Sequence, residues 1–204
     1  MLKLAGECIE GQMADHIARL DAHTYNLLQK FRTGEYIETL LGTTAAANAL
    51  AANKLYAVPF VVARAMTFDR IAVQVTTLAA GSSIRLGIYN DGTNLYPGAL
   101  LLDAGEVSAA TTGVKAITIN QALTKGLYWL ALVSDGAPAI YFNYWGWAGL
   151  GKVATNFSDE QYRYWSVSFT YAALPDPFTT GGSRTSANAK PGIFMRLASL
   201  DEGG

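Results

Sequence analysis

The chain has 204 residues, of which 50% are hydrophobic, and its 15 basic and 16 acidic residues give a formal net charge of −1. This length suits one well-buried domain with an appendage. Charged residues make up 15% of the chain, against about a quarter in an average globular protein. A nucleic-acid partner is not expected, because it would require a basic patch. Membrane insertion is not expected either, since no run approaches the roughly 20 apolar residues of a spanning helix.

The N-terminus and the cysteine content narrow the class further. The opening residues, "MLKLAGECIEGQ", lack the apolar centre of a secretory signal peptide. Cys8 is the only cysteine, so an intrachain disulfide and a zinc site built on several thiolates are both excluded. We expect no cofactor and no metal.

The segment from Met13 to Phe31 has apolar residues at alternating steps of four and three, the spacing of a heptad seam. Two interpretations remain open: a helix through which copies of the chain associate, and an ordinary amphipathic helix packed on its own domain. A short helix needs packing partners in either case. We expect residues 1–40 to form a helical oligomerisation segment whose contacts come from Met13, Ile17, Leu20, Leu27 and Phe31.

Residues 41–54 are rich in alanine and predict a linker. From Leu55 onward the hydrophobic period changes to two, as in "TFDRIAVQVTT" and "SIRLGIYN", which is typical of half-buried strands. About eight strands separated by turn clusters predict a mainly β fold over 55–204, an antiparallel β-sandwich of the jelly-roll type. The long polar stretch "LPDPFTTGGSRTSANAKP" predicts a functional or mobile loop, and its glycine pair favours mobility.

No arrangement of residues predicts catalysis. Both histidines, His16 and His23, lie in the N-terminal segment, so no histidine is available for a nucleophilic triad among the strands. Paired carboxylates would suit a glycosidase, but the acids stand in turn sequences such as "NDG", where aspartate bonds to backbone. "NDGTN" near Asp91 lacks the residues of a calcium loop. We therefore expect no enzyme.

Aromatic residues are concentrated in "IYFNYWGWAG" and "QYRYWSVSFTY". Phe142, Trp165 and Phe169 are expected in the core, because alternate residues of a strand face it. A second group stands at a glycine-flanked turn, where rings are harder to bury. This group has three interpretations: a platform that stacks on a sugar, a subunit interface, or plain core and rim. Its candidate residues are Tyr144, Trp145, Trp147 and Arg163.

The segment Arg85 to Gly136 resembles a β-sandwich (jelly-roll-like) module of tailed-bacteriophage virion proteins, which occurs in tail fibres, receptor-binding proteins, and head fibres or spikes. The shared elements are "RLGIY", "PGALL", "DAG", "TTG", "ITI" and "GLYWLAL". They consist of turn residues and alternating core residues, so they imply a fold and a virion setting without assigning any binding residue.

What the resemblance implies is a structural protein on the exterior of a phage or phage-like particle, on capsid or tail. Residues 1–40 would then assemble copies, as homotrimers, and anchor them to other capsid or tail proteins. The β domain would be displayed for attachment to a host surface glycan or for capsid decoration. Two alternatives stay open: a free carbohydrate-binding module and a polysaccharide depolymerase.

Overall fold

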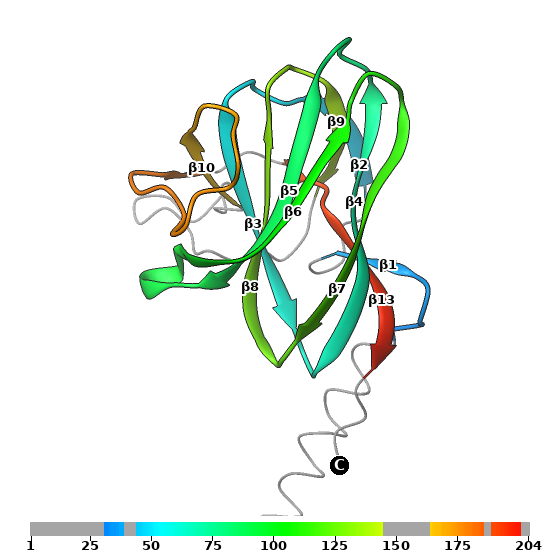
Figure 1. Ribbon diagram of the computed structural model, residues 1–204, viewed down its shortest axis with the longest axis vertical. Coiled ribbons are helices and arrows are strands. Elements are labelled where there is room, and N and C mark those ends of the chain that lie inside the picture. The colour runs from blue at the N-terminus through cyan, green and yellow to red at the C-terminus, as the bar shows by residue number, and fades with distance from the viewer. Residues whose placement is uncertain (1–30, 39–43, 145–163, 186–188, 201–204) are drawn as a thin grey trace, which may run out of the picture. The chain divides into compact units, whose positions relative to one another are not determined.

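The computed structural model describes residues 31–38, 44–144, 164–185 and 189–200. The elements below all lie in Thr33–Gly204, the second of the two units into which the chain divides. These residues form mainly antiparallel β-strands in two sheets, an arrangement consistent with a β-sandwich. The axes of the long strands of both sheets are roughly aligned, and neighbouring strands point in opposite directions (Figure 1). Over the described residues, no helix has the length and apolar character needed to cross a bilayer.

The first sheet has six strands, and each pairs antiparallel with its neighbours. The β5–β6 hairpin turns through a short 3-10 helix, η1 (Thr93–Leu95). In spatial order the strands are β11 (Ser183–Thr185), β10 (Tyr164–Ser168), β3 (Lys54–Val62), β8 (Gly126–Ser134), β5 (Ser83–Asp91) and β6 (Pro97–Ser108).

The second sheet has seven strands and is also antiparallel. Two of them lie off its main path: β2 (Thr44–Ala49) pairs with β9, and β7 (Gly113–Leu123) pairs with β4. The main path runs β1 (Tyr36–Ile37), β13 (Phe194–Leu200), β4 (Met66–Thr77), β9 (Ala139–Tyr144) and β12 (Ala189–Pro191).

The core between the sheets follows from the alternation of the strands. Phe60 of β3 meets Phe68 of β4 edge to face, with ring centroids 5.6 Å apart. Because successive side chains of a strand point to opposite faces, Val58 and Val62 face the second sheet together with Phe60. All of these residues are buried, so the spacing in the sequence accounts for this core.

The six-stranded sheet is buried on its other face as well. In β8 every residue from Trp129 to Ser134 is buried, which is the pattern of a strand covered on both sides. The cover is residues 169–182, called here the cap segment, which is the orange loop beside β10 in Figure 1. The long polar loop that begins at Leu174 was expected to be functional or mobile. Its first part, as far as Gly182, packs on the sheet, where Leu174 and Phe178 are buried.

Strands appear where alternation predicts them, at β3, β4, β5, β7, β8, β9, β10 and β13, whereas β6 is not predicted by alternation. The alanine-rich range 41–54 differs from the expected linker, since β2 and the start of β3 lie within it. Small side chains give no alternation to read, yet their backbone pairs along β9. Likewise β1 lies within 1–40 and pairs with β13. Phe31 is in neither helix nor strand, and the other residues of the expected helical seam lie outside the described residues.

Candidate functional site

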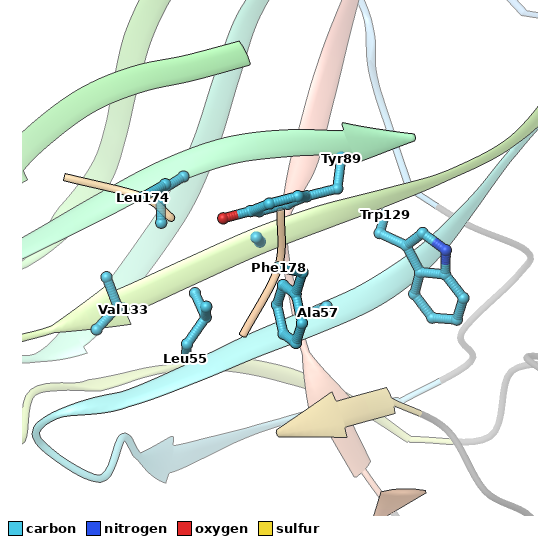
Figure 2. Packing of buried hydrophobic residues seen from close by; sticks show 8 residues of the cluster. Leu55, Ala57, Tyr89, Trp129, Val133, Leu174 and Phe178 are labelled. Carbon is cyan, nitrogen blue, oxygen red and sulfur yellow. The ribbon is translucent and has the colours of Figure 1, made fainter. Parts of the chain in front are cut away.

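The cap segment is held first by a chain of aromatic contacts. Tyr89 of β5 meets Phe178 edge to face, with centroids 5.2 Å apart and planes at 86°. Tyr96 stands between Phe178 and Trp165, at 5.6 and 4.7 Å. Figure 2 shows the Phe178 ring beside Leu55 and Ala57, with Tyr89 and Leu174 above them. Rings from β5, the β5–β6 turn, β10 and the cap segment thus form one cluster.

A glycine makes room for the cap segment. A Cβ atom on Gly87 would lie 2.2 Å from Leu174 Cδ1 and 2.5 Å from the carbonyl oxygen of Leu102. Real Cβ atoms do not approach other atoms so closely. Leu174 therefore fits against the sheet because residue 87 has no side chain.

Polar groups of β5 and β6 bind the backbone of the cap segment. The Tyr89 hydroxyl donates to the carbonyl of Pro175 (2.8 Å), and burial, with the nearby carboxylates of Asp103 and Asp176, raises the pKa of this tyrosine. In the other direction, the Leu100 amide donates to Asp176 Oδ1 (2.9 Å). These bonds satisfy backbone groups that lack a strand partner.

The Tyr96 hydroxyl makes two hydrogen bonds to the backbone of the cap segment. It donates to the carbonyl of Thr179 (2.6 Å) and accepts from the amide of Gly182 (2.9 Å). The end of the cap segment is therefore fixed to the β5–β6 turn by one side chain.

Asp103 of β6 joins the sheet and the cap segment. Its two oxygens accept from Arg85 Nη1, each at 3.0 Å. One of them also accepts from the amide of Leu174 (3.1 Å), and the other from Gly105 (3.0 Å). The carboxylate is saturated with donors, which suits a structural anchor rather than a reacting group.

The start of the cap segment is held at Tyr171. Its hydroxyl donates to Glu106 Oε2 (2.5 Å) and its amide to Asn53 Oδ1 (2.9 Å). Desolvation, followed by the bond to Glu106, raises the pKa of Tyr171 to about 12. This contact is more exposed than those of Tyr89 and Tyr96.

A hollow of about 280 Å³ lies beside this cluster, and the described residues that line it are Asn94, Leu95, Trp165 and Arg184. Trp165 Nε1 donates to the carbonyl of Leu95 (2.7 Å), which fixes the indole against the β5–β6 turn. Arg184 stands directly opposite Trp165 across the β10–β11 pair. Its guanidinium lies 5.8 Å from the ring centroid, within the range of a cation–π contact.

The turn that lines the hollow is strained. Asn94 and Leu95 have φ of 58° and 55°, a region that asparagine tolerates and leucine rarely adopts. Leu95 is also 44% exposed. Strained backbone of this kind concentrates at functional sites, and here it holds an apolar side chain at the mouth of a hollow.

The described carboxylates of the β region have structural partners. Asp91 accepts from Trp129 Nε1 (2.8 Å), Asp135 from the amide of Ser83 (2.7 Å), and Asp69 from Arg196 (2.6 and 2.8 Å). The bond to Arg196 lowers the pKa of Asp69. In the described ranges, no three histidine, cysteine or acidic side chains are grouped so as to hold a metal.

Some of the candidate residues in the aromatic stretches pack in the domain, and the others lie outside the described residues. Phe142 is buried, while Trp165 and Phe169 are half-buried against the cap cluster. Tyr144 ends β9, with its backbone opposite Thr44 and Ala189. Trp145, Trp147 and Arg163 lie outside the described residues.

Asn143 directly precedes Tyr144 in β9. It is buried, and its amide donates to Glu38. Its hydrogen-bonding capacity is therefore used inside the domain.

The lining of the hollow was not found from the sequence. The sequence pattern predicts Trp165 in the core, and Asn94 belongs to "NDGTN", which was compared only with a calcium loop. Arg184 stands in the polar loop stretch without a distinguishing neighbour. In the sequence, only the aromatic run that contains Trp165 pointed to this site. The β5–β6 turn and β11 are far apart along the chain and come next to Trp165 only in the folded domain.

Comparison with protein-family models, with curated proteins and with solved structures gives no match to this chain. The resemblance to phage virion modules therefore stays a prediction that comes from the residues alone.

Proposed function

We propose that this chain is a non-enzymatic structural protein of a phage or phage-like particle, a fibre or spike that displays its β domain to a host surface. The fold proposed is jelly-roll-like. The observation that carries the proposal is the resemblance of Arg85 to Gly136 to virion modules. "RLGIY" lies in β5, "PGALL" and "DAG" in β6, "ITI" in β7 and "GLYWLAL" in β8. Five of the six shared elements thus lie within strands, and "TTG" lies at the turn between β6 and β7.

Two features of the structure support a binding role without catalysis. The carboxylates described above are engaged with arginine, tyrosine, tryptophan or backbone donors. A hollow lined by indole, guanidinium and amide opens beside the cap segment. Such a mixture of an apolar platform with a few polar groups is typical of ligand sites.

In this proposal residues 1–40 associate as trimers and anchor the protein to other proteins of the capsid or tail. The protein then lies on the exterior of the particle, where the β domain contacts host glycans or decorates the capsid. A free carbohydrate-binding module is the second candidate, which the hollow favours equally. The two candidates differ in whether the chain assembles.

Size-exclusion chromatography with light scattering of the full chain tests this difference. The expected result is an oligomer, a trimer of the 21.8 kDa chain. A variant lacking residues 1–32 keeps β1 and its pairing with β13, so it should retain the circular dichroism of a β protein and become a monomer. A full chain that stays monomeric at high concentration would contradict the proposal and favour the free binding module.

A further inference from the structure

We infer that the domain forms an isopeptide bond between the side chains of Lys190 and Asn143, with the Glu38 carboxylate transferring the protons. The inference goes beyond the proposed function, since it concerns a covalent modification within the chain itself. It starts from a cluster of three polar side chains. Lys190 lies in β12, Asn143 lies in β9, and Glu38 directly follows β1.

Two members of this cluster are withdrawn from water. Lys190 is 2% exposed and Asn143 is 6% exposed, and every residue of β12 is buried. Lysine is almost never buried to this degree unless it is paired. A buried ion pair is by itself weak support for stability, because both charges lose their hydration. A reaction between the groups explains why they are buried together.

The strand register brings the amine and the amide to the same place. Lys190 stands directly opposite Asn143 across the β9–β12 pair. Directly opposed residues of an antiparallel pair extend from the same face of the sheet, with Cβ atoms about 4.5–5.5 Å apart. The lysine stem is long enough to carry Nζ across that distance to Cγ of the asparagine.

Glu38 contacts both reacting groups through one oxygen. The amide Nδ2 of Asn143 donates to Glu38 Oε2, and Lys190 Nζ lies 3.9 Å from the same oxygen. The Glu38 side chain is 18% exposed, so solvent has little access to the three groups. A carboxylate in this position can take a proton from the ammonium and deliver it to the amide nitrogen, first as general base and then as general acid.

Gly192 keeps space beside the amide. A Cβ atom at this position would lie 3.3 Å from Asn143 Nδ2 and 2.9 Å from the carbonyl oxygen of Tyr141. During the reaction Cγ of Asn143 changes from planar to tetrahedral, which requires room next to the amide. A residue without a side chain supplies that room.

The reaction exchanges one amide for another and requires no oxidant. Removal from water favours the neutral form of a lysine, and transfer of its proton to Glu38 leaves an amine that attacks Cγ of Asn143. The Nζ–Cγ bond forms and the Cγ–Nδ2 bond breaks. The lysine nitrogen gives up a second proton, and both protons leave with Nδ2 as ammonium. Glu38 is then a carboxylate again.

The product closes a loop in the chain. The bond joins residues 143 and 190, so the chain between them, which includes the cap segment, has both ends fixed at one point of the second sheet. Such a link restricts the unfolded chain in the way that a disulfide does. It requires no cysteine, and this chain has one.

Mass spectrometry of the full-length protein tests the bond. After folded protein is kept overnight at neutral pH, its intact mass should be lower than that of the sequence by one molecule of ammonia. Trypsin cleaves after lysine and arginine but not before proline, so it should release residues 126–152 joined to residues 185–196. Fragmentation of the joined peptides should place the link at Asn143 and Lys190.

Three variants assign the roles. Lys190→Arg keeps the positive charge but has no nucleophilic amine, and Glu38→Gln keeps the size of the side chain but cannot take up a proton. Both should retain the full mass of their own sequences and give no joined peptides. Lys54→Arg is the matched control, because this lysine lies in β3 of the six-stranded sheet and its replacement should leave the bond intact. Circular dichroism checks that each variant is folded.

Wild-type protein that keeps its full mass and releases the two peptides separately would overturn the inference. Loss of ammonia without joined peptides would place the change at another amide and would contradict it equally. Undiminished joining in Lys190→Arg or in Glu38→Gln would do the same for the residue concerned. The wild-type measurement is decisive even if a variant fails to fold. None of these results depends on whether the chain assembles, so the proposed display function is tested separately.

Discussion

The six-stranded sheet is covered on both faces, and the two covers are built differently. Toward the second sheet it presents alternating aliphatic and aromatic residues such as Val58 and Phe60, which pack against strands that pair along their backbones with a few local register shifts. On the other face, the irregular cap segment supplies Leu174 and Phe178 and is tied down by hydrogen bonds from tyrosine and aspartate side chains. The first cover depends on area, and the second on a few individual contacts.

Because of this difference, we expect a mutation in the inter-sheet core to lower the stability of the whole domain and a mutation in the cap segment to act locally. Residues in the inter-sheet core belong to a cooperative unit, so losing one of them lowers the stability of the whole. The cap segment can detach while both sheets remain, because irregular segments open at lower free energy than core strands. The hollow at Trp165 lies beside this second cover.

The largest difference between the two covers is expected from a matched pair of truncations, Phe60→Ala and Phe178→Ala. Both rings are 1% exposed. Replacing a buried phenylalanine by alanine lowers the free energy of unfolding by about 3–5 kcal/mol. Phe60→Ala should show this full loss in urea unfolding. Phe178→Ala should fall at or below the lower end, because opening of the cap segment limits the cost.

Hydrogen exchange distinguishes the two outcomes. In Phe178→Ala, amides of residues 169–182 should exchange faster while those of β3 and β8 keep their protection. In Phe60→Ala, protection should fall throughout both sheets. Uniform loss of protection in Phe178→Ala would mean that the cap segment belongs to the same cooperative unit as the core.

An intermediate effect is expected from Gly87→Ala. The added methyl group would clash with Leu174 Cδ1 and with the backbone carbonyl of Leu102 in β6, so both the cap segment and β6 must shift, at a cost of about 1–3 kcal/mol. Thermal unfolding measures the loss. Gly126→Ala, also in the six-stranded sheet, is the control, because its nearest neighbour would lie 3.6 Å away in ordinary contact. Equal stability of the two variants would contradict the packing described here.

The smallest effect concerns pH. The pKa of Tyr171 is about 12 in the folded chain, against about 10 when unfolded. The unfolded chain therefore loses this proton first, and the contribution of Tyr171 to stability is complete below about pH 10 and declines toward pH 12. At neutral pH, Tyr171→Phe should cost about 0.5 kcal/mol, near the lower end for a hydrogen bond because the contact is partly exposed.

Urea unfolding of both proteins across this window is the measurement. The difference in unfolding free energy between wild type and Tyr171→Phe should narrow as pH rises through 10–12. A difference that stays constant over the whole range would show that the hydroxyl does not keep its proton through Glu106.

Alternation in the sequence predicted eight strands of the two sheets, β3, β4, β5, β7, β8, β9, β10 and β13, because a strand with one face in the core has a hydrophobic period of two. It failed at β2, where alanine at successive positions carries no period, although its backbone pairs residue by residue with β9. Aspartates in turn sequences were expected to bond to backbone of their own turns. Asp176 of "PDP" instead accepts from the amide of Leu100, 76 residues away along the chain.

The hydrophobic period can be read from neighbouring residues. It was therefore enough to predict the mainly antiparallel β class and the residues that fill the space between the sheets. The tertiary structure alone decided what covers the other face of the six-stranded sheet. Gly87 and Leu174 fit together, and Trp165 and Arg184 share a hollow with Leu95, only after segments distant in the chain are brought side by side. No local spacing encodes such contacts, because each depends on the register of strands that pair across the whole domain.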